Sequence, residues 1–475
     1  MTANKKRVAI VGGGITGLAA AFYLNKDQQE AYDFTLFEQS GRLGGKIQTL
    51  KRDGFIIERG PDSLVARKPS GVKLIQDVGL EADLVGNHAG QSYVLNHDEL
   101  HPIPGGAIMG IPTEIQPFIE TSLFSLKGKA RAAFDLILPR QSRENVDQSL
   151  GHFFRKRLGH EVVENLIEPL LSGIYSGDID ELSLMATFPQ FYEVERKHRS
   201  LILGMKKTAQ RSQKKSGKSG GQRKTSAFVT LKSGLESLVH QIEALLPEHS
   251  VRKHAAVEKI VKKQKGYEIQ LEGGETGEFD AVILAAPHTA VRHLLRDNPF
   301  VEKLKDYPVG SVANVAMAFD AGQVKFEQDG TGFVVSRNAD YTITACTWTN
   351  RKWPHTAPNG KVLLRGYVGR PGNAEIVDAD DETMIRTVLA DLKKIMRIDG
   401  QPSFHVITRW KHAMPQYTVG HKFRMDALKS NVQAELPGIF LAGSSYEGVG
   451  IPDCIDQGVA AASEVRAFLQ GKRKS

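Results

Sequence analysis

Three glycines near the start of the chain have the spacing of a phosphate-binding turn. Gly12, Gly14 and Gly17 form the pattern G-x-G-x-x-G in "VAIVGGGITGLAAAF". The first glycine allows a tight turn, the second lets the backbone approach a pyrophosphate, and the third lets a helix pack closely on a strand. Glu38 follows about twenty residues later, where a carboxylate can accept hydrogen bonds from a ribose 2′-hydroxyl. These residues predict a dinucleotide site.

The segments around the glycines have the composition needed to position them. "RVAIV" is a short β-branched run typical of a strand, "LAAAFYLNK" is rich in helix formers, and "DFTLFE" predicts a second strand that leads into Glu38. In this order the helix N-terminus faces the phosphates. The alternative is a secretory signal at residues 5–24. That stretch lacks a clear cleavage site, and its three consecutive glycines would interrupt the apolar core of a signal.

Two further glycine-rich turns indicate a cofactor longer than one pyrophosphate site requires. "SGRLGGKIQT" (40–49) follows Glu38 directly, and "GFIIERGPDS" (54–63) adds a strand and a third turn. Arg42 and Lys46 offer cations for a pyrophosphate, and the glycines of the second turn let the backbone approach a ligand.

The C-terminal segment contains another strand, turn and helix. "IFLAG" (439–443) predicts a short buried strand, and a helix is expected to begin near Ile451 because Pro452 suits a first helical turn. Asp453 and Asp456 suit the positive end of its dipole. A helix N-terminus aimed at the pyrimidine carbonyl of a flavin would stabilise negative charge on the reduced ring. We therefore expect the two ends of the chain to meet at one site.

With these motifs the chain resembles the flavin-containing amine oxidase superfamily. Within it, five segments are similar to bacterial coproporphyrinogen III and protoporphyrinogen oxidases of the Gram-positive type. They are spread over nearly the whole chain, so the resemblance is not confined to one domain. The segments are "ERGPDS", "NLIEPLLSGIYSGD" (165–178), "PQFYEVERKHRSLILGMKK" (189–207), "ACTWTNRKWP" (345–354) and "EGVGIPDCIDQG" (447–458).

The resemblance implies FAD as the cofactor and assigns its contacts. Gln39 has no support beyond the resemblance. Val257 lies in a predicted hairpin near the adenine, and Trp410 ends an alternating strand; an ordinary strand residue and a core tryptophan remain the alternatives for these two. The implied FAD contacts are Gly12, Gly13, Gly14, Ile15, Thr16, Gly17, Glu38, Gln39, Lys46, Gly60, Pro61, Asp62, Ser63, Val257, Trp410, Val449, Gly450 and Ile451.

The resemblance also implies an activity in haem biosynthesis. This is the six-electron oxidation of coproporphyrinogen III to coproporphyrin III, with dioxygen as acceptor and hydrogen peroxide released; protoporphyrinogen IX is the alternative substrate. Ile174 and Tyr367 line the substrate slot by resemblance, and Arg67 and Lys68 are candidate partners of its propionates. Electron-rich pyrroles flank the reacting carbons, so we expect no catalytic side chain and no metal. His405 and His412 receive no role.

Two other functions remain open from the sequence. A different oxidase of the same superfamily, acting on amines or carotenoid precursors, would keep the FAD contacts and change only the cavity. A flavin- or tetrapyrrole-binding carrier without turnover would use its basic segment to meet a partner. Ferrochelatase is the partner considered for such a carrier, and it is also a candidate for transient contact with a porphyrinogen oxidase.

The sequence predicts an α/β plus α fold with a discontinuous Rossmann-like FAD-binding domain. Because its glycine landmarks stand at opposite ends of the chain, this domain must be assembled from separate segments. In the middle segment, "SGLESLVHQIEALL" has helical spacing and "FDAVILAAP" is a buried-strand run. We assign to this domain residues 1–91, 225–296 and 418–475.

The remaining residues predict two further domains. Residues 297–417 contain alternating strands and one amphipathic helix near 380–396, typical of a mixed-sheet substrate domain. Residues 92–224 look mainly helical; "LGHFFRKRLG" places Leu150, Phe153, Phe154 and Leu158 on one face. The resemblance implies that this mainly helical domain caps the substrate cavity. It is expected to end in a basic flexible loop near 206–224.

The net charge of +8 comes from one segment. Eleven Lys or Arg and no Asp or Glu lie between Arg196 and Lys224, and without them the net charge would be −3. The segment has no aromatic residues, which argues against nucleic acid as a partner. A solvated loop is the plain interpretation of the segment, and a patch for an anionic membrane or polyanion is the alternative.

Cysteine content and hydropathy favour a cytoplasmic protein. Cys346 and Cys454 match no disulfide framework or metal-ligand spacing, so both thiols are expected to be free in a reducing compartment. No apolar run reaches the roughly 18 to 20 residues that span a bilayer. Some members of the resembled family dock on membranes, so loose peripheral membrane contact is also expected.

Overall fold

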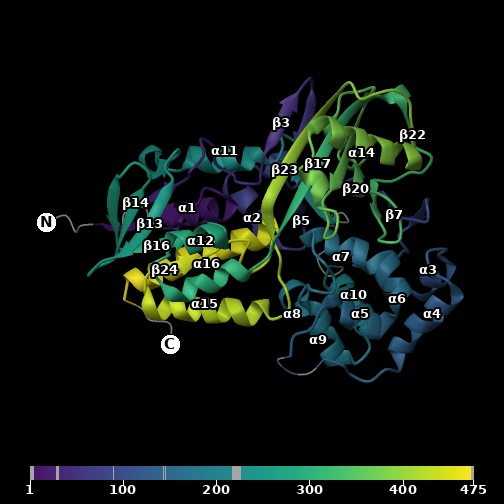
Figure 1. The fold of residues 1–475 in the computed structure, drawn as a ribbon, viewed down its shortest axis with the longest axis horizontal. Helices are drawn as coiled ribbons and strands as arrows, with labels where there is room; N and C mark the ends of the chain where they lie inside the picture. The colour runs from purple at the N-terminus through teal and green to yellow at the C-terminus, as the bar shows by residue number, and fades with distance from the viewer. Residues whose placement is uncertain are drawn as a thin grey trace.

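The computed structural model describes residues 5–27, 32–88, 90–142, 144, 146–216 and 226–471. Figure 1 shows three parts: a parallel sheet with its helices at the left, a second sheet at the upper right, and a helical region at the lower right. The predicted α/β plus α fold is confirmed.

A five-stranded parallel sheet brings both ends of the chain together. Its order is β12-β2-β1-β16-β24, so strands from the beginning, middle and end of the chain are neighbours. The central strands are buried on both faces, which explains why they read as continuous apolar runs. The strands are β12 Val251–Arg252, β2 Tyr32–Phe37, β1 Lys6–Val11, β16 Ala281–Leu284 and β24 Ile439–Leu441.

Different layers cover the two faces of this sheet. Val8 and Ile10 of β1 pack in the core formed with helices α1, α2, α11 and α16. Ala9 and Val11 point the opposite way, into a core shared with strands β13 to β15 and helices α12 and α15, because successive strand residues alternate between faces. The covering elements are α1 Ile15–Asp27, α2 Pro69–Asp77, α11 Glu236–Leu245, α16 Ile451–Leu469, β13 Val257–Lys262, β14 Tyr267–Leu271, β15 Thr276–Phe279, α12 His288–Leu294 and α15 His421–Glu435.

The second sheet has seven strands in the order β23-β17-β21-β20-β19-β7-β8. Its pairs are antiparallel except for β19 with β7. Helix α14 (Asp381–Ile395) packs into the same core and is the amphipathic helix predicted near 380–396. The strands are β23 Phe404–Pro415, β17 Val309–Asp320, β21 Lys361–Val368, β20 Ile343–Trp348, β19 Gly332–Val335, β7 Ser92–Asn96 and β8 Glu99–Pro102.

Strands β7 and β8 differ from the expected division, which placed residues 92–102 with the helical part. They form a hairpin that joins the seven-stranded sheet through a parallel pairing with β19. This pairing connects positions more than two hundred residues apart, for example Tyr93 with Phe333. Periodicity within the segment carries no information about so distant a partner.

The helical region lies between residues 115 and 216 and has its own core. Leu150, Phe153, Phe154 and Leu158 are all fully buried, as their spacing predicts. Its helices are α3 Ile115–Glu120, α4 Leu126–Ala133, η2 Phe134–Leu136, α5 Leu150–Leu158, α6 His160–Val162, η3 Val163–Ile167, α7 Glu168–Tyr175, α8 Leu184–Thr187, α9 Pro189–His198 and α10 Leu201–Ser216.

Helix α10 corrects the prediction of a flexible loop near 206–224. Residues 206–216 continue the helix that starts at Leu201, because Leu201 and Met205 anchor it in the helical core and the following Lys, Ala, Gln and Arg residues favour helix. Residues 217–224, the rest of the predicted loop, lie outside the described residues. Helices long and apolar enough to span a bilayer are absent from the described part of the chain.

Shorter elements complete the fold. The hairpin of β3 and β4 leads into the third glycine turn, and β5 and β6 flank β11. These elements are β3 Thr49–Arg52, β4 Phe55–Glu58, β5 Leu64–Val65, β6 Leu84–Gly86, β9 Ala107–Ile108, β10 Ile111–Pro112, β11 Phe228–Leu231, β18 Val324–Lys325, β22 Arg397–Ile398, α13 Thr349–Lys352, η1 Glu81–Asp83, η4 Glu248–Ser250, η5 Pro299–Asp306, η6 Ala321–Gln323, η7 Pro354–Thr356 and η8 Glu375–Val377.

Candidate cofactor and substrate site

The glycine turn between β1 and α1 has the shape that a phosphate site needs. Gly12 has a φ of +109°, and a Cβ there would lie 2.6 Å from the carbonyl oxygen of Ala285. A Cβ at Gly17 would clash with the carbonyl oxygen of Gly12. By contrast, a Cβ at Gly14 would meet no described atom within 4 Å. The turn is thus closed toward β16 and open at Gly14, where the first N–H groups of α1 can bind a pyrophosphate.

Glu38 is held directly beside this turn. Its Oε2 accepts a hydrogen bond from the Gly13 N–H at 2.8 Å, and its Oε1 accepts from the N–H and hydroxyl of Ser40 at 2.9 and 2.8 Å. The carboxylate therefore lies next to the phosphate turn, as expected for a ribose partner. Gln39 beside it is exposed, while Ile15 and Thr16 at the start of α1 are buried.

The second and third turns contact the first through their backbones. Gly44 donates its N–H to the Gly13 carbonyl at 2.8 Å and forms a bridge with Gly14. A Cβ at Gly60 would clash with the carbonyl oxygen of Lys46. Three glycine turns that are separate in the sequence therefore form one continuous cradle.

The two cations of the second turn have different surroundings. Arg42 donates to the carbonyls of Gly45 and Ile47 at 2.9 and 2.6 Å and pairs with Glu236 at 2.9 Å. Its guanidinium holds its own loop, so the expected phosphate contact of Arg42 has no support. Lys46 donates to the Ala413 carbonyl, and burial lowers the pKa of its ammonium group.

The seven-stranded sheet fixes the third turn. The carbonyl oxygen of Arg59 accepts hydrogen bonds from Asn314 Nδ2 at 2.8 Å and from Trp410 Nε1 at 3.0 Å. The next carbonyl, that of Gly60, accepts from Arg365 Nη2. Trp410 therefore lies beside the third turn, and its contact with FAD stays a prediction. Pro61 continues this turn.

Asp62 is part of a partly buried ion pair that the sequence did not reveal. Its Oδ2 lies 3.0 Å from Lys352 Nζ, and its Oδ1 accepts from the Ser63 hydroxyl at 2.7 Å. Burial alone would raise the pKa of Asp62, but Lys352 and Arg365 hold it well below its usual value. The segment "TNRKWP" was singled out by resemblance, yet periodicity gave no sign that its lysine pairs across the molecule.

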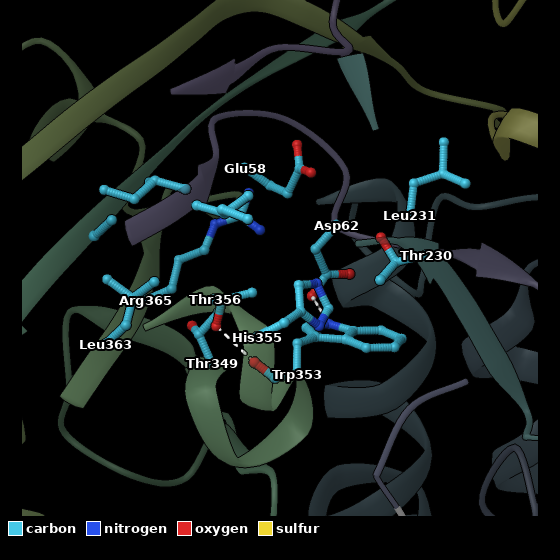
Figure 2. A pocket seen from close by; sticks show the side chains of 13 residues that line it. Glu58, Asp62, Thr230, Leu231, Thr349, Trp353, His355, Thr356, Leu363 and Arg365 are labelled. Carbon is cyan, nitrogen blue, oxygen red and sulfur yellow. Dashed lines mark hydrogen bonds between the residues drawn. The ribbon is translucent and has the colours of Figure 1, made fainter. Parts of the chain in front are cut away.

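Behind the third turn lies a small internal cavity. Figure 2 shows Glu58, Asp62 and Arg365 around it, together with Thr349 and His355. Its volume of about 10 Å³ has room for about one water, so it is too small for either a dinucleotide or a porphyrinogen. Burial raises the pKa of Glu58 to about 7, although Leu235 N–H and the Thr49 hydroxyl donate to its carboxylate.

Helix α16 completes the cradle from the C-terminal side. It begins at Ile451, directly after Val449 and Gly450, as the sequence predicts. It packs against α1 so closely that a Cβ at Gly458 would clash with the carbonyl oxygen of Thr16. The N-termini of these two helices, from opposite ends of the chain, therefore point toward one region.

The hairpin that contains Val257 follows Glu38 along the cradle. Ala255 donates its N–H to the Glu38 carbonyl at 2.9 Å, and His254 donates to the Ser40 carbonyl at 3.0 Å. Val257 opens β13, pairs with Leu271 and is half-buried. Its contact with the adenine stays a prediction.

The predicted substrate residues differ in their surroundings. Ile174 near the end of α7 is 46% exposed and the adjacent Gly173 is also exposed, whereas Leu171 and Tyr175 of the same helix are buried. Tyr367 is half-buried on β21, with its hydroxyl 3.4 Å from that of Thr347. Arg67 is exposed and approaches Met109, whereas Lys68 forms an ion pair with Asp453. Both cysteines are free, as predicted, and both are buried.

Known proteins resemble the chain over almost its full length. The family of flavin-containing amine oxidoreductases matches residues 15–466. Coproporphyrinogen III oxidase of Bacillus subtilis is 56% identical, covering 99% of this chain and 100% of the relative. The Staphylococcus aureus enzyme of the same name is 44% identical, with coverage of 98% and 100%. A solved structure from Exiguobacterium sp. 255-15, provisionally named protoporphyrinogen oxidase, is 41% identical with a TM-score of 0.86, covering 98% and 99%.

The residues of the cradle fit a flavin dinucleotide. The turn is open at Gly14, Glu38 lies beside it, and the helix N-termini of α1 and α16 converge on it. The chain therefore belongs to the flavin-containing amine oxidoreductase family and is an FAD-dependent oxidoreductase.

Proposed function

We propose that this protein oxidises coproporphyrinogen III to coproporphyrin III in haem biosynthesis, with dioxygen as the electron acceptor. Six hydrogens leave the substrate in three two-electron rounds, and three dioxygen molecules become three molecules of hydrogen peroxide. The observation that carries the proposal is full-length similarity, at 56% and 44% identity, to two proteins named coproporphyrinogen III oxidase.

The chain's own residues supply binding and orientation. FAD, when bound, supplies the capacity to accept a hydride. The residues from Gly12 to Gly17 hold the pyrophosphate and Glu38 holds a ribose, while the turn from Gly60 to Ser63 is fixed to the seven-stranded sheet. Groups of three or more possible metal ligands are absent from the described residues. Since the substrate's pyrroles activate its bridging carbons, we assign no side chain as nucleophile or general base.

The substrate is proposed to lie between the seven-stranded sheet and the helical region. Ile174 offers an exposed apolar side chain from α7. Tyr367 lies on the sheet beside Arg365, which donates to the turn from Gly60 to Ser63. Arg67 and Lys68 follow this turn and are proposed to bind propionates. Lys68 shares its charge with Asp453, so Arg67 is the stronger candidate of the two.

Steady-state rates on two porphyrinogens test the function. We expect faster oxidation of coproporphyrinogen III, with three peroxide molecules released per porphyrin. Faster oxidation of protoporphyrinogen IX, the name carried by the Exiguobacterium relative, would replace the proposed substrate. Oxidation of amines alone would indicate another activity of the family, and porphyrinogen binding without peroxide would indicate a carrier.

We also propose a cytoplasmic protein that meets an anionic membrane surface loosely and contacts ferrochelatase transiently. Free cysteines favour a reducing compartment. Exposed apolar side chains lie on α3, α4 and the following turn, at the tip of the helical region in Figure 1. Lys127 is exposed among them. These apolar residues are Ile115, Ile119, Leu126, Phe134 and Ile137.

Vesicle flotation tests the membrane contact. Wild-type protein should float with vesicles that contain anionic lipid more than with neutral vesicles, because apolar contact and basic charge act together. Replacing Leu126 and Ile137 with Glu should abolish flotation and leave porphyrinogen oxidation unchanged. Equal recovery of wild-type and variant protein with anionic vesicles would refute the contact.

A further inference from the structure

Arg365 is a buried cation that the sequence analysis did not select. It lies on β21 and is 3% exposed. It shares a strand face with Tyr367, because alternate residues of a strand point the same way. Its guanidinium carbon lies 5.1 Å from the centre of the Tyr367 ring, while Nη2 donates to the Gly60 carbonyl. One side chain thus contacts both the cofactor turn and a predicted substrate residue.

The surroundings of Arg365 show which contacts offset the cost of burying its charge. No ion pair joins Arg365 to a carboxylate within the described part of the chain; Asp62 and Glu58 act on it only at longer range. Its Nε is buried with no hydrogen-bond partner among the described residues. Burying a guanidinium is costly unless its contacts compensate for lost water. Here the contacts are with the cofactor turn and the Tyr367 ring.

The turn depends on several contacts with the same sheet. Asn314 and Trp410 hold the Arg59 carbonyl, and Arg365 holds the next one. Two consecutive peptide groups are therefore fixed by three side chains from strands β17, β21 and β23. Asn314 lies opposite Tyr367 in the pairing of β17 with β21, and Arg365 packs its guanidinium over the Tyr367 ring. Both therefore join the turn to the predicted substrate slot, and of the three side chains Arg365 is the one that brings a positive charge there.

We propose that Arg365 is a positioning residue that fixes the Gly60 turn and the Tyr367 ring relative to each other, and so aligns bound flavin and porphyrinogen. The inference rests on the proposed function for the identity of the substrate. Its effect on the cofactor turn can be measured without substrate. The planar guanidinium group of arginine can donate to a carbonyl and pack on an aromatic ring at the same time, and the ammonium group of lysine does this less well.

The test replaces Arg365→Met and Arg365→Lys in the FAD-loaded protein. For R365M we expect FAD affinity to fall about tenfold, the effect of losing one charge-assisted hydrogen bond. The midpoint potential of the bound flavin should fall too, because a nearby positive charge is lost. The KM for coproporphyrinogen III should rise more than kcat falls. R365K should restore the potential and leave KM raised, because it keeps the charge without the fork.

A matched control is Lys361→Met on the same strand. Lys361 pairs with exposed Asp320 at 2.6 Å, away from the turn, so K361M should leave FAD affinity, potential and KM unchanged. If R365M lowers only the melting temperature, as a purely structural residue would, the proposal is overturned. If R365M does not fold, unchanged FAD affinity and KM in R365K would overturn it. If the wild-type protein does not oxidise porphyrinogens, the proposed substrate is wrong. If R365M still binds FAD more weakly in that case, the role of Arg365 at the Gly60 turn stands.

Discussion

The pKa of Glu58 lies in the neutral range because its carboxyl group is buried and its hydrogen bonds only partly offset the cost of burying its charge. Burial raises its pKa from 4.5 to about 7 in the folded protein. Between these values the folded state binds a proton that the unfolded state has released. The contribution of Glu58 to folding stability therefore falls as the pH rises from about 4.5 to about 7, and this contribution changes no further above that range.

Replacing Glu58→Gln should remove this pH dependence. The shift corresponds to about 3 kcal/mol, so E58Q should gain up to that amount over wild type at pH 8 and much less at pH 5. Urea unfolding of both proteins at the two pH values measures the difference. A stability difference between E58Q and wild type that is the same at both pH values would show that Glu58 does not titrate as described.

Asp62 is the opposite case, a carboxylate kept ionised by its partners. Replacing Asp62→Asn leaves Lys352 and Arg365 without their nearby negative charge. We expect a loss of about 2 kcal/mol of unfolding free energy, between the costs of breaking an exposed pair and a fully buried one, because this pair is partly buried. The double variant D62N/K352M should recover most of it, because the unpaired lysine is gone. Denaturant unfolding checks both; no recovery in the double variant would point to the turn geometry instead of the charge.

At the scale of elements, substitutions at two glycines should affect cofactor binding and folding separately. A Cβ at Gly14 would point into open space, whereas one at Gly458 would strike the backbone of α1 at Thr16. G14A should fold normally and bind FAD about ten- to a hundredfold more weakly, because the methyl occupies the pyrophosphate's place. G458A should lose about 1–3 kcal/mol of stability through overpacking. Thermal unfolding of the apoproteins and FAD titration measure the two effects; comparable destabilisation of both apoproteins would contradict this view.

Local patterns predict local elements, and several were predicted correctly. The strand, turn and helix at residues 6–27 and the helix from Ile451 appear as expected, because glycine spacing and helix-start signals act over a few residues. The pairing of β7 with β19 and the Asp62–Lys352 pair were missed, because each joins distant segments. Arg365 did leave a signal: a charged residue on the alternating strand "KVLLRGYV", facing inward beside Tyr367.

Contacts with the helical region also hold the C-terminal turn in place. Asp147 Oδ2 accepts from the Ser183 hydroxyl at 2.6 Å and from the Gly420 N–H at 2.7 Å. Tyr417, three residues before Gly420, donates its hydroxyl to the Ser444 carbonyl at 2.7 Å. The strand-to-helix turn before α16 is thus linked to the helical region by short polar contacts, which sequence periodicity cannot reveal.

For the whole molecule, cofactor binding should stabilise together segments that are remote in the chain. A ligand at 100 times its dissociation constant stabilises the folded state by about 2.7 kcal/mol. Since we propose that FAD is bound by turns from both ends, its removal should speed amide exchange together at residues 12–17, 40–49, 59–63 and 449–457. Helix α5 has a separate core, fully buried around Phe153 and Phe154, and should stay protected. Hydrogen exchange with and without FAD measures this; a change at only one end would mean that the two glycine landmarks do not bind one cofactor.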